Sequence, residues 1–161
     1  MATINLSDYT PLDIKNADEF NIGIVVSEWN DFVTFNLRDA AVETLLKEGV
    51  KKDKIKIYYV PGAFELSYAA MRLCAKQRYF DAVIAIGCVI RGETSHFDYV
   101  CQGVTQGITA CNTQTDTPTI FCVLTDDTRE QSIARSGGDL GNKGVEAAVT
   151  ALKMIDFKKN I

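Results

Sequence analysis

Residues 81–90, "DAVIAIGCVI", are the most apolar run of the sequence. A run of this length without alternating polar positions is typical of a strand buried on both faces, as in the middle of a parallel sheet. Further apolar runs of strand length occur at 21–26, 54–60 and 118–125. Because three of the four runs are continuously apolar, they predict the strands of one parallel sheet.

Segments with helical spacing of apolar residues separate these runs, and we expect helices at 32–49, 66–73, 99–112, 128–135 and 144–157. The alternating order predicts an α/β protein with right-handed crossovers. We expect a flavodoxin-like, three-layer αβα sandwich around a central, mostly parallel, four-stranded sheet. The polar residues 1–20 fit no part of this core. They are expected to form an N-terminal tail or an added edge strand, since "ATINL" (2–6) is long enough to pair with a neighbouring subunit.

Length and composition limit the class of protein. The chain has 161 residues, of which 47% are hydrophobic and 24% charged, and this suits one domain spanning residues 1–161. The net charge is -4 and no large basic cluster occurs, so nucleic acid is not an expected partner. No run approaches the ~18 apolar residues of a membrane span, and the start lacks a signal-peptide pattern. We therefore expect neither membrane insertion nor export.

Several common sites lack their motifs. The first strand is not followed by G-x-G-x-x-G, and neither a P-loop nor a G-x-S-x-G elbow occurs. The five cysteines include no CxxC pair and the chain has one histidine, which argues against a zinc site and for reduced thiols. We expect no metal site and a cytoplasmic location.

In a parallel α/β sheet, ligands bind outside the carboxyl ends of the strands. The segments that follow the predicted strands are "SEWND" (27–31), "VPGAFE" (60–65), "CVIRGETSH" (88–96) and "LTDDT" (124–128). Trp29, Glu65 and His96 should therefore converge on one rim. A lone histidine is more often structural, but at this rim an imidazole that titrates near neutrality suits proton transfer.

Each of the other candidates on this rim has a structural alternative. The loop before His96 has the backbone amides and hydroxyls of an anion site, although Thr94 or Ser95 could merely cap a helix. Trp29 could be a core residue or could stack on a heterocycle, and Glu65 could pair with a helix dipole or accept hydroxyl hydrogen bonds.

Two basic residues near the C-terminal helices also have two interpretations. Arg135 could stabilise a helix end or bind phosphate, and Lys143 could be a solvated residue of a first turn or donate to a carbonyl oxygen. The sequence pattern leaves both pairs of alternatives open.

The motifs "WND" (29–31), "VPGAFELSYAA" (60–70), "GCVIRGETSHFDYV" (87–100) and "GNKGVEAA" (141–148), in this order and spacing, resemble the lumazine synthase family. The resemblance covers about residues 22–154. It implies condensation of 5-amino-6-(D-ribitylamino)uracil with 3,4-dihydroxy-2-butanone 4-phosphate to 6,7-dimethyl-8-ribityllumazine, the penultimate step of riboflavin biosynthesis. Phosphate and water are released, and neither cofactor nor metal takes part.

The resemblance also implies roles for individual residues. His96 matches the proton-transfer histidine, and Trp29 stands where the family more often has phenylalanine. The pyrimidine and ribityl site would comprise Trp29, Asn30, Ala63, Phe64, Glu65, Cys88, Val89, Ile90, Phe121 and Lys143. The phosphate site would comprise Gly92, Glu93, Thr94, Ser95 and Arg135, although a Glu93 carboxylate that faced inward would repel an anion. Family members form pentamers in which Phe121, Arg135 and Lys143 would come from the adjacent subunit.

Some family members build icosahedral shells, and the short spacing between Arg135 and Lys143 favours a shell here. Riboflavin synthase is then a conceivable partner. The rival hypotheses are a flavodoxin-like FMN protein, and a shell or riboflavin-binding module without catalysis. The joint presence of His96, Arg135 and Lys143 argues against lost catalysis, because a binder has little need of a proton shuttle.

Overall fold

The computed structural model describes residues 5–75 and 79–161. Four parallel strands form the central sheet in the order β2-β1-β3-β4. Their bounds are Ile22–Ser27 for β1, Ile55–Val60 for β2, Ala82–Ile90 for β3 and Thr119–Asp126 for β4. Each strand begins and ends within one residue of its predicted run, so the prediction of a parallel α/β sheet is confirmed.

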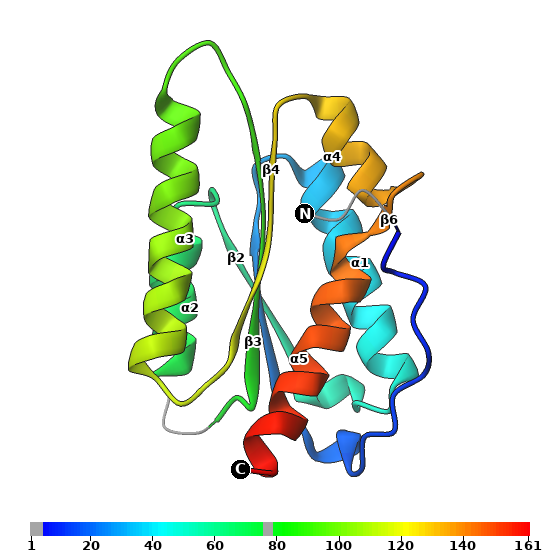
Figure 1. Ribbon diagram of the computed structural model, residues 1–161. Helices are drawn as coiled ribbons and strands as arrows, with labels where there is room; N and C mark the ends of the chain where they lie inside the picture. The colour runs from blue at the N-terminus through cyan, green and yellow to red at the C-terminus, as the bar shows by residue number, and fades with distance from the viewer. Residues whose placement is uncertain (1–4, 76–78) are drawn as a thin grey trace.

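Within the described residues, five α-helices connect or follow these strands: α1 (Asp31–Lys47), α2 (Leu66–Cys74), α3 (His96–Gln114), α4 (Arg129–Arg135) and α5 (Lys143–Lys159). Figure 1 shows α2 and α3 on one face of the sheet and α1 and α5 on the other. Two short 3-10 helices occur at Ala17–Glu19 and Lys52–Lys54, and the two-stranded hairpin of β5 (Ser136–Gly138) and β6 (Gly141–Asn142) joins α4 to α5. The expected three-layer αβα sandwich is therefore observed.

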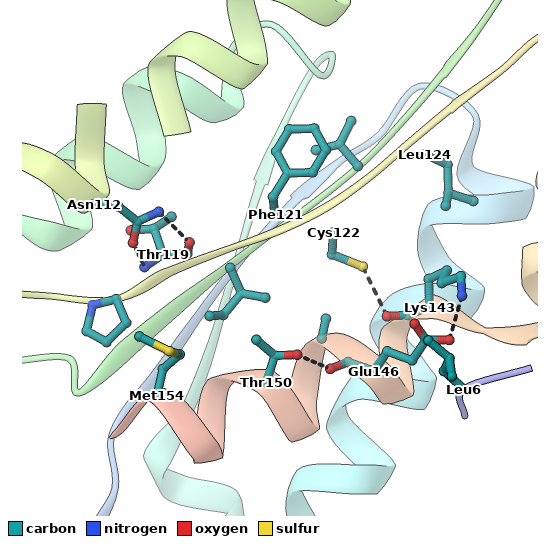
Figure 2. A pocket seen from close by; sticks show the side chains of 14 residues that line it. Leu6, Asn112, Thr119, Phe121, Cys122, Leu124, Lys143, Glu146, Thr150 and Met154 are labelled. Atoms are coloured by element: carbon teal, nitrogen blue, oxygen red, sulfur yellow. Dashed lines mark hydrogen bonds and ion pairs between the residues drawn. The ribbon is translucent and has the colours of Figure 1, made fainter. Parts of the chain in front are cut away.

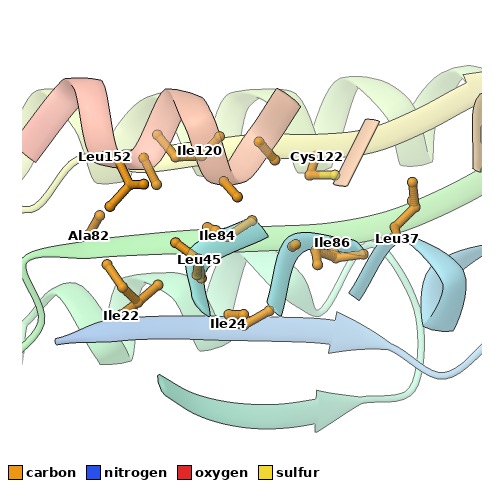
Figure 3. Packing of buried hydrophobic residues seen from close by; sticks show 14 of the residues in the cluster. Ile22, Ile24, Leu37, Leu45, Ala82, Ile84, Ile86, Ile120, Cys122 and Leu152 are labelled. Carbon is orange, nitrogen blue, oxygen red and sulfur yellow. The ribbon is translucent and has the colours of Figure 1, made fainter. Parts of the chain in front are cut away.

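The alternation of side chains along the buried strands builds a core on each face of the sheet. On β3, Ile84 and Ile86 pack with α1 and α5, whereas Val83 and Ala85 belong to the cluster under α2 and α3. Figure 3 shows the first cluster, in which Leu37 and Leu152 meet the isoleucines of the sheet. Strand β2 lies at an edge, and its residues are mostly exposed, which explains why its sequence is the least continuously apolar of the four.

The N-terminal segment crosses the outside of the α1–α5 layer. The Ser7 hydroxyl donates to the Asn142 carbonyl at 3.0 Å and accepts from the Asn142 amide at 2.7 Å. Residues 5–16 form no strand, so the described part of this segment fits the expected tail rather than an added strand within the chain. Residues 2–4 of the proposed pairing segment lie outside the described residues.

Three helices begin earlier than the spacing predicts, and α1 does so by one residue, at Asp31. Helix α3 begins at His96, not at residue 99, so His96 belongs to the first helical turn rather than to a polar loop. Helix α5 begins at Lys143, one residue before the predicted start. In each case the first residue of the helix is polar, and a search for apolar periodicity does not count a polar residue. No helix in the two described ranges has the length and apolar character that crossing a membrane requires.

Candidate active site

A cavity of about 470 Å³ opens at the carboxyl ends of β1 and β3, beside the first turns of α2 and α3. This arrangement is the one that the strand-end rule predicts. It brings together Trp29, Glu65 and His96, three residues that lie far apart in the sequence. The complete lining comprises Trp29, Asn30, Ala63, Phe64, Glu65, Cys88, Val89, Ile90, His96, Tyr99 and Val100.

The turn between β1 and α1 presents Trp29 to this cavity. Asn30 has a left-handed backbone (φ 60°), a conformation that asparagine tolerates better than most residues. Its Nδ2 donates to the Cys88 carbonyl at 3.0 Å and so joins the turn to the end of β3. Trp29 is 67% exposed, which shows that the core interpretation was wrong. A Cβ at position 62 would lie 2.6 Å from the indole, so the ring can lie against this backbone only because residue 62 is glycine.

The segment before α2 lines the cavity beside Trp29. The Glu65 Oε2 accepts a hydrogen bond from the Gly62 amide at 3.1 Å, which fixes the carboxylate just ahead of the first residue of α2. Phe64 is 57% exposed, and its ring lies over Gly103 of α3, where a Cβ would come within 2.6 Å. A flat ring and a held carboxylate therefore stand side by side at the mouth of the cavity.

The end of β3 forms the cavity floor. Cys88 is buried, and its thiol donates to the Ser132 hydroxyl at 3.5 Å. Burial is the main cause that raises the pKa of Cys88 to about 11, and the nearby Asp126 carboxylate adds to it. The sulfur is therefore a neutral thiol at physiological pH. It lines the cavity with Val89 and Ile90 as an apolar surface rather than as a nucleophile.

The loop from Gly92 to Ser95 is exposed and leads directly into α3. Ser95 occupies the N-cap position without a side-chain cap, whereas the Thr94 hydroxyl accepts from the His96 amide at 3.4 Å. Thr94 precedes the N-cap, so neither hydroxyl makes the usual side-chain cap to the second or third amide of the helix. The backbone amides that begin a helix of this length carry a positive partial charge, which suits an anion.

Phe121 and Lys143 line a different cavity, of about 740 Å³, along the open edge of β4. Figure 2 shows Phe121 and Cys122 on opposite sides of this strand, with Lys143 near Cys122. The Lys143 side chain is 10% exposed, and its Nζ lies 2.6 Å from Glu146 Oε1, so of its two interpretations the one as a solvated residue is wrong. This second cavity holds no member of the set that contains His96.

Arg135 lines neither cavity. Its Nη1 donates to the Gln131 carbonyl at 2.9 Å, and its Nε lies 3.9 Å from the buried Asp126 carboxylate. Asp126 also accepts from the Ser132 hydroxyl at 2.9 Å. Within one chain, the structure thus keeps Phe121, Arg135 and Lys143 apart from the cavity of Trp29 and His96.

Three lining or pairing residues were not predicted from the sequence. Tyr99 and Val100 line the His96 cavity, and Glu146 pairs with Lys143. Each stands three or four positions after a predicted site residue on the same helix, and positions at this spacing share a helix face. Helical spacing counted from His96 and Lys143 could have found them.

A family sequence model described as 6,7-dimethyl-8-ribityllumazine synthase matches residues 19–159. The chain belongs to this lumazine synthase family. The lumazine synthase of Parabacteroides distasonis is 56% identical over 153 residues, which cover 95% of each chain. That of Porphyromonas gingivalis is 54% identical over 155 residues, or 96% of each chain. The Flavobacterium johnsoniae lumazine synthase is 57% identical over 150 residues, or 93% of this chain and 78% of the relative.

Proposed function

We propose that this protein condenses 5-amino-6-(D-ribitylamino)uracil with 3,4-dihydroxy-2-butanone 4-phosphate to 6,7-dimethyl-8-ribityllumazine in riboflavin biosynthesis. The choice of this reaction rests on the match to the lumazine synthase family. One observation supports the site: an exposed aromatic ring, a held carboxylate and the only histidine of the chain line one cavity at the strand ends. Both substrates are small molecules, and the reaction needs neither a cofactor nor a metal.

The pyrimidine would stack on the exposed ring of Trp29, with Asn30, Ala63 and Phe64 at its borders. Glu65 would accept hydrogen bonds from the ribityl hydroxyls, and its position is already fixed by the Gly62 amide. Val89 and Ile90 would present backbone groups to the ring. The neutral Cys88 beside them would contribute apolar contact.

The phosphate of the four-carbon substrate would bind at Gly92, Thr94 and Ser95, where the loop enters α3 and the helix dipole favours an anion. Arg135 would add a planar guanidinium that can bind phosphate through two donors. Glu93 lies in the same exposed loop. We assign Glu93 to the edge of this site, with its carboxylate turned toward solvent so that it does not repel the phosphate.

The proposed chemistry consists of proton transfers and eliminations. The ring amine attacks the butanone carbonyl and water leaves to give an imine. Phosphate is then eliminated, and the second amine closes the new ring with loss of a second water. His96 would move protons in these steps. The stacked pyrimidine and anchored phosphate would supply the orientation that makes the two reactants combine.

We further propose that the complete site is shared between adjacent subunits of a pentamer, with Phe121, Arg135 and Lys143 supplied by the neighbour. The separation of these residues from the His96 cavity within one chain supports this assembly. We propose that pentamers assemble into an icosahedral shell, with riboflavin synthase as a candidate partner. Each chain would contribute one domain of residues 1–161, and the five free thiols fit the reducing cytoplasm.

The test is turnover by the purified protein. Both substrates are mixed with limiting enzyme, and lumazine appearance is followed by absorbance while released phosphate is measured in parallel. Saturable lumazine formation with an equal amount of phosphate supports the proposal. Formation at the uncatalysed rate by a folded, assembled sample would contradict it and favour a binding or shell protein. A light-scattering mass equal to one pentamer would refute the shell.

A further inference from the structure

Arg91 follows the last residue of β3, and its guanidinium joins three parts of the chain. Nε lies 2.7 Å from Asp127 Oδ1. Nη2 lies 3.1 Å from Asp98 Oδ1, and Nη1 donates to Asp98 Oδ2 at 3.4 Å. The face of the guanidinium stacks on Phe97, with Cζ 4.1 Å from the ring centroid. We call this arrangement of Arg91, Phe97, Asp98 and Asp127 the Arg91 clamp.

The clamp connects the two ends of the loop that leads into α3. Arg91 stands immediately before Gly92, whereas Phe97 and Asp98 stand immediately after His96. One side chain therefore holds both ends of the segment 92–96. Phe97 is 8% exposed and belongs to the core, so it gives the guanidinium a fixed surface. The backbone amide of Arg91 also donates to the Asp126 carbonyl at 3.0 Å, which joins this end of the loop to β4.

The loop itself has few other contacts that could fix it. Residues 91–96 are all exposed, and a Cβ at Gly92 would meet nothing within 4 Å. The His96 position is therefore set from the C-terminal side by Phe97, which the core fixes and on which Arg91 stacks, and by Asp98, which pairs with Arg91. The second carboxylate, Asp127, ties the same guanidinium to the segment that leads into α4.

The clamp is too exposed to be a main source of fold stability. The side chains of Arg91, Asp98 and Asp127 are 42%, 60% and 65% exposed, and ion pairs in such positions contribute little to the free energy of unfolding. The planar guanidinium of Arg91 uses all three of its nitrogens as donors and also stacks on an aromatic ring, so it fixes the relative orientation of its partners. The ammonium group of a lysine cannot reproduce this arrangement. The geometry is better suited to alignment than to stabilisation.

We propose that Arg91 is a positioning residue for the condensation, which aligns His96 and the 92–95 loop through Phe97, Asp98 and Asp127. This inference rests on the proposed function of the same site. It does not assign Arg91 a contact with substrate. Substitutions of its carboxylate partners distinguish positioning from attraction of the phosphate. Removing the carboxylate of Asp127 or Asp98 weakens the clamp, whereas the positive charge of Arg91 stays in place.

The experiment measures kcat and KM for both substrates in the assembled enzyme. Arg91→Ala is expected to lower kcat roughly tenfold, a part of the ~100-fold that a 1 Å misplacement can cost, with little change in the melting temperature. Asp127→Asn and Asp98→Asn should also lower kcat at nearly unchanged KM. Arg91→Lys keeps the charge and should not restore the wild-type kcat.

Arg38 provides a matched control, because its Cζ lies 4.4 Å over Phe35 and its Nε lies 2.7 Å from Asp39, away from the cavity. Arg38→Ala should keep the wild-type kcat. If Arg91 only attracted phosphate, Arg91→Ala would raise KM and Asp127→Asn would lower it, and this result would overturn the proposal. A wild-type kcat in Asp127→Asn, Asp98→Asn and Arg91→Lys would do the same. If Arg91→Ala fails to assemble, these three variants decide the question.

Wild-type turnover separates this inference from the proposed function. An inactive wild-type protein contradicts both the function and the role of Arg91. An active wild-type protein whose clamp variants keep the wild-type kcat contradicts the role of Arg91 alone.

Discussion

Gly144→Ala is expected to loosen the packing of α5 against α1 and to lower the melting temperature. Gly144 is the second residue of α5. A Cβ at this position would overlap the carbonyl oxygen of Leu37 on α1 and would lie 2.8 Å from its carbonyl carbon. Both obstacles are backbone atoms in the middle of a helix, so no side-chain rotation can relieve them. The two helices must therefore move apart. Leu37 of α1 and Ala148 of α5 belong to the core between them, so this separation loosens the core.

The size of the effect follows from two opposing contributions. Overpacking of a core costs about 1–3 kcal/mol, and an overlap with backbone belongs at the upper end of that range. Replacing glycine by alanine inside a helix contributes up to about 1 kcal/mol of stability. The net loss is about 2 kcal/mol, which corresponds to a melting temperature lower by about 4–8 °C for a chain of this size.

The assay is thermal unfolding followed by circular dichroism, at one fixed protein concentration because assembly affects the apparent stability. Gly92→Ala is the matched control, because a Cβ there meets no atom within 4 Å, and its melting temperature should be unchanged or slightly raised. A Gly144→Ala protein that melts within about 2 °C of the wild type would show that the close approach of α1 and α5 is not as described.

Four further predictions address the site and the core. His96→Ala should keep measurable turnover, lowered roughly 10²-fold; turnover at the uncatalysed rate would show that His96 does more than transfer protons. Arg135→Ala should chiefly raise the KM for the phosphate-bearing substrate, and an unchanged KM would refute its assignment. Leu152→Ala should cost about 2–5 kcal/mol in urea unfolding, because Leu152 is fully buried; a loss below about 1 kcal/mol would contradict its place in the core. Cys88, buried and with its pKa raised to about 11, should resist iodoacetamide in the native protein at neutral pH, as mass spectrometry would show; rapid native labelling would contradict its burial.

The strands and the rim were predictable because burial leaves a direct trace in the sequence. The continuous apolar run that becomes β3 requires cover on both faces, and a parallel sheet gathers its strand ends at one edge. Trp29, Glu65 and His96 follow three different strands, so the topology alone brought them together. The start of α3 was not predictable in the same way, because its first residue, His96, is polar and adds nothing to an apolar period.

Other features depend on contacts that no periodicity records. Lys143 is buried because Glu146, one turn later, pairs with it at the edge of β4, whereas the charge of a lysine alone predicts exposure. The positions of Phe121 and Arg135 raise a different problem. If their partners lie on a neighbouring chain, as we propose, neither the apolar periods nor the strand-end rule could bring them to the His96 cavity, and only the family resemblance indicated that they belong there.

The most direct test of an active site shared between subunits is complementation between two defective chains. His96→Ala and Arg135→Ala chains are co-expressed, the mixed oligomers are purified, and kcat/KM for the phosphate-bearing substrate is compared with that of each parent. If every site takes His96 from one chain and Arg135 from its neighbour, random mixing leaves about a quarter of the sites with both residues intact. A shared site predicts kcat/KM near a quarter of the wild-type value, well above both parents. Activity no higher than the average of the parents would contradict a site shared between subunits.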